Sequence, residues 1–235
     1  MYKNACVSAD IVASRSLESR DLQALTAKTL ELLDLLSAKY NTKNRTCFCG
    51  RLVKGDYVEC VVRHPGAALR TVMLLKCGIK SFVPQSKAPT AIAAKMQRLF
   101  RSYGIRAAIG MGDMYPVTTT ADVWTGEAII RSGRLIEQQK TSDKDRPIVK
   151  RTLFFDAGTP HTTRLFDSIL RPLDYILNRA TARQSEILFW RLYGKSEAET
   201  GQLLTMSQAA VNQQAASAGW NALESALTFF EQYNF

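Results

Sequence analysis

Two aspartates, Asp10 and Asp56, have the residue type and the placement that metal and phosphate chemistry requires. Asp10 ends an apolar run, and Asp56 follows Lys54 and Gly55 between two β-branched runs. Such runs around a Lys-Gly-Asp turn predict a tight β-hairpin, in which Asp56 lies where two strands end together. Paired carboxylates from neighbouring strands can hold Mg²⁺ or Mn²⁺ and, through that ion, a phosphate. Asp10 and Asp56 are therefore the candidate metal ligands.

A structural interpretation of the same pair is equally open. Asp often caps the turn after a strand and often shapes a hairpin, so Asp10 and Asp56 can serve the backbone alone. Single Asp residues are common, and the two residues do not decide between these interpretations.

The helices and strands that must bring Asp10 and Asp56 together can be predicted from the spacing of apolar residues and from the turn residues between them. A buried strand over 3–9 precedes a helix that reaches about residue 40, then hairpin strands near 45–53 and 56–63 and a helix to about Lys76. A linker over 81–89, a helix over 90–103 and a strand over 104–112 come next. A hairpin-like stretch over 113–124, a helix over 126–139, a charged loop over 140–151 and a strand over 148–155 complete this part.

This order predicts an α+β fold with a ferredoxin-like antiparallel sheet, covered by helices on one face. In that topology the first strand ends beside the hairpin, so Asp10 and Asp56 become neighbours. We expect this sheet domain to span residues 1–157, with a connecting helix over 158–180.

Residues 181–235 predict a separate all-α domain. Thr181 with Gln184 and Ser196 with Glu199 form capping boxes, and Ser207 marks a third helix start. Three starts at this spacing predict a helix-turn-helix. We expect the third helix to continue to about Phe230 along an apolar stripe. Its start supplies the candidate DNA-contacting residues Ser207, Gln208, Asn212 and Gln213.

The balance of positive and negative residues differs between the first part of the chain and its C-terminal part. The 235 residues carry a net charge of +10, and residues 1–150 alone hold 24 Lys and Arg against 13 Asp and Glu. This excess favours phosphate-bearing partners, although a basic soluble surface would look the same. From residue 195 onward, Lys195 is the only cation against four glutamates. That acidic balance opposes binding to duplex DNA, so the basic first part would have to supply the phosphate contacts.

Composition limits the remaining classes. Five cysteines are an odd number without a disulfide framework, and Cys47 and Cys49 with only two histidines in the chain indicate buried thiols rather than zinc. No apolar run reaches about 18 residues, and the start lacks the build of a signal peptide. A cytoplasmic protein without a membrane segment is the simplest interpretation.

The ordered motifs resemble those of the SatD family of bacterial proteins, in which a domain like the palm of class III nucleotidyl cyclases precedes a sigma-factor-like helix-turn-helix. The matching segments are 8–15, the hairpin at 54–56, 105–112, 126–135, 181–184 and 207–211. The resemblance implies that Asp10 and Asp56 bind metal, and that Ile11, Lys54 and Gly55 lie at the nucleotide. It places Arg134 at the arginine that stabilises charge on the transferred phosphate. Ile130 and Leu52 stand where the ribose-binding asparagine and the base-selecting lysine are expected.

Three hypotheses follow. The first is a SatD-like regulator, with a degenerate cyclase-like domain that binds a nucleotide or phosphorylated ligand, and Mg²⁺ or Mn²⁺, without efficient catalysis. Its helix-turn-helix would contact DNA or a partner. The second is an active metal-dependent nucleotidyl transferase or cyclase. The third is a non-catalytic interaction protein without a cofactor, which forms a homodimer through its C-terminal helices.

Overall fold

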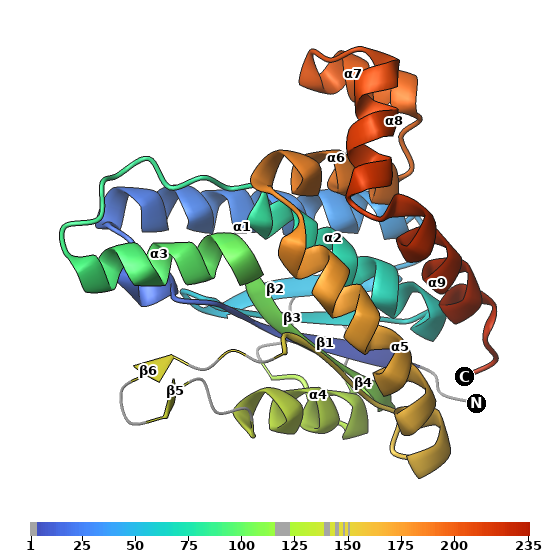
Figure 1. The fold of residues 1–235 in the computed structure, drawn as a ribbon. Helices are drawn as coiled ribbons and strands as arrows, with labels where there is room; N and C mark the ends of the chain where they lie inside the picture. Colours follow the sequence, from blue (N-terminus) through green and yellow to red (C-terminus); the bar gives the residue numbers. More distant parts are fainter. Residues whose placement is uncertain (1–3, 116–122, 139–141, 144–145, 148, 150) are drawn as a thin grey trace.

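The computed structural model describes residues 4–115, 123–138, 142, 143, 146, 147, 149 and 151–235 (Figure 1). Its centre is a five-stranded sheet with the order β2-β3-β1-β4-β7. The strands are β1 (Asn4–Ile11), β2 (Phe48–Lys54), β3 (Tyr57–Val62), β4 (Ile105–Gly112) and β7 (Leu153–Asp156). β1 pairs antiparallel with both β3 and β4. Helices pack against this sheet, so the predicted α+β class is confirmed.

The edge strand β7 differs from the prediction of an antiparallel sheet. β7 runs parallel to β4, so the sheet is mixed. A parallel neighbour requires a crossover connection, and α4 (Glu127–Glu137) lies in the chain between these strands. The short strands β5 (Ser142–Asp143) and β6 (Arg146–Pro147) form a separate two-stranded sheet. Most of the predicted hairpin over 113–124 lies outside the described residues.

The first face of the sheet is covered by α1 (Ser19–Tyr40) and α2 (Ala68–Lys80), with the short helices η1 (Ser14–Ser16) and η2 (Pro65–Ala67) before them (Figure 1). α1 is the helix predicted to reach about residue 40, and its apolar side buries Leu25, Leu32, Leu33 and Leu36. α3 (Ala91–Tyr103) begins where the Thr90 hydroxyl accepts a hydrogen bond from the Ala93 N–H at 3.1 Å. These helices lie where the periodicity predicted them.

The second face is covered by α4, which corrects the prediction of helices on one face (Figure 1). The buried residues of α4 are Ala128, Ser132 and Ile136, and the Ser132 hydroxyl lies 2.8 Å from that of Ser8 in β1. Gly110 permits this close packing, because a Cβ there would lie 2.2 Å from the Ala128 carbonyl oxygen. The group that approaches the backbone of β4 at Gly110 is therefore α4.

The C-terminal part consists of five helices: α5 (Pro160–Arg179), α6 (Ala182–Tyr193), α7 (Glu197–Leu204), α8 (Gln208–Ser217) and α9 (Trp220–Gln232). Both predicted capping boxes and the start at Ser207 are confirmed. The predicted continuation of the third helix to Phe230 is wrong. Gly219 adopts a left-handed conformation with φ of 82°, so the chain turns there and α9 starts anew.

One apolar cluster connects the sheet with the C-terminal helices. It contains Val7 of β1, Phe155 of β7, Phe166 of α5, Leu188 of α6 and Phe230 of α9, all buried. The predicted boundaries at residues 157 and 180 remain a prediction, but the packing shows that α6 and α9 help to build the core beside the sheet. None of the helices in the described part of the chain has the length and apolar character needed to cross a membrane.

Candidate functional site

Asp10 lies near the end of the central strand, between two side chains of its neighbours. In the strand register it stands opposite Tyr57 of β3 and Arg106 of β4, so all three project from the same face. The Arg106 guanidinium forms an ion pair with the Asp10 carboxylate, and the two side chains are 10% and 25% exposed. Tyr57 is half-buried, and burial raises the pKa of its phenol. Asp10 therefore already has a positive partner.

Asp56 lies in the turn between β2 and β3, as predicted, and its backbone adjoins the end of β1. The Ile11 N–H donates a hydrogen bond of 2.9 Å to the Asp56 carbonyl oxygen. The Asp56 carboxylate instead accepts a hydrogen bond of 2.6 Å from the hydroxyl of Ser14, which is buried in η1. The topology thus brings the two aspartates to the same end of the strands, where β1 ends beside the β2–β3 turn. Each carboxylate has a different partner there.

Both carboxylates of the predicted metal site have partners within the chain, and the metal site itself stays a prediction. Arg106 already neutralises the Asp10 carboxylate through an ion pair, so a metal ion bound there would compete with this guanidinium. Among the described residues, no cluster of three or more His, Cys, Asp or Glu side chains could hold a metal ion. A divalent ion here would need further ligands from elsewhere, and phosphate oxygens are the usual source for Mg²⁺.

The other residues implied by the resemblance lie at different depths. Lys54 and Gly55 are exposed in the hairpin turn, while the Ile11 side chain is buried. Arg134 is exposed on α4 and lies between the buried residues Ser132 and Ile136 in sequence, so it projects from the side of the helix away from the sheet. The structure therefore does not bring Arg134 together with Asp10.

The residues predicted to contact DNA lie at the start of α8. The Ser207 hydroxyl caps the helix by accepting the Ala210 N–H at 3.2 Å. Gln208 and Gln213 are exposed. The Asn212 amide donates to a carboxylate oxygen of Glu197 in α7 at 2.8 Å, and this hydrogen bond lowers the pKa of Glu197. α8 thus offers amide groups on an outer surface whose neighbour is acidic.

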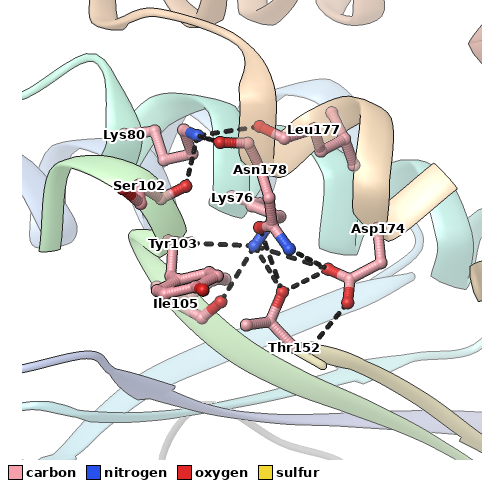
Figure 2. A network of polar contacts seen from close by, with 9 residues as sticks. All are labelled: Lys76, Lys80, Ser102, Tyr103, Ile105, Thr152, Asp174, Leu177 and Asn178. Atoms are coloured by element: carbon pink, nitrogen blue, oxygen red, sulfur yellow. Dashed lines mark hydrogen bonds and ion pairs between the residues drawn. The ribbon is translucent and has the colours of Figure 1, made fainter. Parts of the chain in front are cut away.

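Sequence reasoning missed two buried lysines on α2 (Figure 2). The Lys76 ammonium donates to the carbonyls of Tyr103 at 2.8 Å and Ile105 at 3.1 Å, and to the Thr152 hydroxyl at 2.8 Å. It lies 3.9 Å from a carboxylate oxygen of Asp174. Asp174 is fixed by the N–H of Thr152, which donates to it at 2.6 Å.

Lys80 lies one helical turn further along α2. Its ammonium donates to the carbonyl of Ser102 in α3 at 2.6 Å, and to those of Leu177 and Asn178 in α5 at 2.8 and 2.9 Å (Figure 2). These carbonyls lie in the last turns of two helices, where a cation complements the helix dipole. The signal in the sequence was a pair of lysines four residues apart within the apolar segment 68–80.

The stability of the protein should depend on pH through Lys80. Burial, together with the nearby charge of Lys76, lowers the pKa of Lys80 to about 7. Between that value and the ordinary pKa near 10.4, the unfolded chain binds a proton that the folded protein has released. The free energy of unfolding then rises with pH. We expect the stability difference between wild type and Lys80→Met to grow by about 1–2 kcal/mol from about pH 6.5 to about pH 8.5. Urea titrations at both pH values measure it, and a difference that shrinks would contradict the placement of Lys80.

Comparison with known proteins gives no match to any family model, curated protein or solved structure. The resemblance to the SatD family therefore remains an expectation from the motifs.

Proposed function

We propose that this protein is a SatD-like regulator, whose sheet domain binds a nucleotide or phosphorylated ligand without turning it over. The observation that carries the proposal is the ion pair between Asp10 and Arg106 beside the exposed hairpin turn. An arginine at this edge can contact phosphate, whereas metal-assisted transfer would need Asp10 free for a cation. The strand order β2-β3-β1-β4, as in a ferredoxin-like sheet, is consistent with a cyclase-like palm.

A divalent ion would reach this site together with the ligand. Mg²⁺ is commonly held by one or two carboxylates together with the phosphates of a nucleotide, so Mg²⁺ or Mn²⁺ could bind between Asp56 and such phosphates. The positions of Leu52 and Ile130 support binding of phosphate rather than selection of a base. Leu52 packs against the main apolar cluster, and Ile130 is exposed on α4. Neither side chain can donate a hydrogen bond to a ribose or a base.

The C-terminal helices would transmit the bound state to DNA or to a partner. α7 and α8 have the order and the short turn of a helix-turn-helix, with Gln208 and Gln213 exposed for contacts. α6 and α9 share the apolar cluster of the sheet. A conformational change in the sheet can therefore be transmitted to α7 and α8 through packed side chains.

A protein partner is the second candidate for the tail, and one observation favours it. Glu197 holds the amide of Asn212, which is one of the few groups on α8 suited to a base edge. A carboxylate in this position repels phosphates. In this alternative the exposed face of α8 forms part of an interface between proteins, which can include a second copy of the chain.

Thermal melting with a panel of nucleoside triphosphates and Mg²⁺ or Mn²⁺ tests the ligand proposal. We expect at least one nucleotide to raise the melting temperature, and Asp56→Asn to reduce this rise, since it removes the charge but can still accept the Ser14 hydrogen bond. Asp34→Asn on the exposed surface of α1 is the matched control, and the rise should persist there. No rise for any nucleotide, or an undiminished rise in Asp56→Asn, would refute the proposal.

A further inference from the structure

A cleft with polar lining residues lies on the side of the sheet that carries α2, bordered by the end of α3, the C-terminal half of α5 and the segment that enters β7. Its volume is about 530 Å³, and it shares no lining residue with Asp10 or Asp56. This is enough room for a small ligand. The lining includes Arg151, Arg171 and Arg179.

Asp167 orients two of these arginines. It accepts hydrogen bonds from both Nη atoms of Arg151, one of them at 2.9 Å, and it lies 3.1 Å from Arg171 one helical turn away. The Arg171 side chain remains 66% exposed, so most of its donors face solvent. Planar guanidinium groups with donors to spare bind phosphate with two parallel hydrogen bonds.

Positive charge exceeds negative charge around the cleft. Four of its lining residues, namely Ser102, Tyr103, Asp174 and Asn178, are also partners of the buried Lys76 or Lys80. Among the described residues this region holds three arginines against the two carboxylates of Asp167 and Asp174, and the buried Lys76 and Lys80 add positive charge while they are protonated. An anion in the cleft would reduce this imbalance.

The buried lysines also remove an obstacle to an anion. α3 and α5 both end beside the cleft, and the free carbonyls of a helix C-terminus repel negative charge. Lys80 donates hydrogen bonds to carbonyls at the C-terminal ends of both α3 and α5, and Lys76 donates one to the carbonyl of Tyr103 (Figure 2). The borders of the cleft therefore present neutralised helix ends together with arginines.

An aromatic ring completes the lining. Tyr175 is 64% exposed, and the Arg179 guanidinium lies 5.5 Å from the centre of its ring. Arg171, Tyr175 and Arg179 recur every four residues along one side of α5. Aromatic rings beside arginines are the surfaces on which nucleic-acid bases stack.

We propose that this cleft binds a small phosphate-bearing ligand of the nucleotide class, with Arg171 and Arg179 on the phosphates and Tyr175 beside the base. The inference does not depend on the ligand proposed for the hairpin. Arg151 contributes charge from the segment that precedes β7.

Isothermal titration with ADP and with pyrophosphate tests the cleft. We expect wild type to bind both probes, and Arg171→Gln or Arg179→Gln to weaken both by about tenfold or more, as expected for charge-assisted contacts. Tyr175→Ala should weaken ADP by about tenfold and leave pyrophosphate unchanged. These three side chains are exposed, so their replacement should preserve the fold. Arg164→Gln, also exposed on α5 but outside the cleft lining, is the matched control and should bind as wild type does.

Three results would overturn the proposal. The first is no binding of either probe at about 1 mM, the limit of weak specific binding. The second is equal weakening by Arg164→Gln and Arg179→Gln, which would indicate general electrostatic attraction. The third is binding that disappears in Asp56→Asn but persists in Arg179→Gln, which would place the ligand at the hairpin. Binding that persists in Asp56→Asn and disappears in Arg179→Gln supports the cleft, even if the hairpin proposal fails.

Discussion

Lys76→Met is expected to lower the free energy of unfolding by about 3–5 kcal/mol, because it leaves the Asp174 carboxylate buried without its cation. Met matches the length of the side chain but replaces none of the three hydrogen bonds that the ammonium donates. Lys76 is fully buried, so water cannot take the place of the lost donor. Urea denaturation followed by tryptophan fluorescence measures the change.

Two further variants show whether the loss comes from the buried pair. Lys95→Met, on the exposed side of α3, is the matched control and should change stability by less than about 0.5 kcal/mol. Lys76→Met combined with Asp174→Asn should cost less than the sum of the single changes by about 1–3 kcal/mol, since the residues are coupled. A Lys76→Met protein within about 1 kcal/mol of wild type would show that the lysine is not held as described.

Phe230→Ala is the second large effect, with an expected loss of about 3–5 kcal/mol. The Phe230 ring is fully buried, and its centre lies 4.8 Å from those of Phe166 and Phe235 and 6.0 Å from that of Phe155. Phe230 belongs to α9 and Phe155 to β7, so the cavity would open between the tail and the sheet. We therefore expect sheet and tail to unfold in one transition that moves to lower urea concentration.

The next residue on α9 provides the control for Phe230. Phe229 is 46% exposed, so Phe229→Ala should cost clearly less than Phe230→Ala. Circular dichroism and tryptophan fluorescence should give coincident transitions in wild type and in both variants. Two separate transitions, of which Phe230→Ala moves the first and leaves the second unchanged, would show that the C-terminal helices are an independent unit.

Local signals in the sequence predicted the parts of the fold that depend on neighbouring residues. Thr181, Ser196 and Ser207 marked helix starts correctly, because an N-cap needs only a hydroxyl and the next few N–H groups. The spacing of elements also predicted that Asp10 and Asp56 lie at one edge of the sheet. Gly219 was available as a stop signal but was outweighed by the apolar stripe around it.

The partners of the site residues could not be predicted in the same way. The ion pair of Asp10 with Arg106 depends on the register between β1 and β4, which are separated by more than ninety residues. The burial of Lys76 and Lys80 depends on where the ends of α3 and α5 meet α2. These are tertiary contacts, and a periodic pattern contains no information about which carbonyl a buried cation will find.

Pyrophosphate release tests the central claim most directly, because the claim is that a nucleotide binds beside Asp10 without turnover. The assay uses wild type with the nucleotide and the Mg²⁺ or Mn²⁺ that raise its melting temperature, so binding and turnover are followed in one mixture. We expect saturable binding and no pyrophosphate above the level without protein. Release of pyrophosphate that is abolished in Asp10→Asn would contradict this account. It would show that Asp10 leaves its ion pair with Arg106 to bind a catalytic cation.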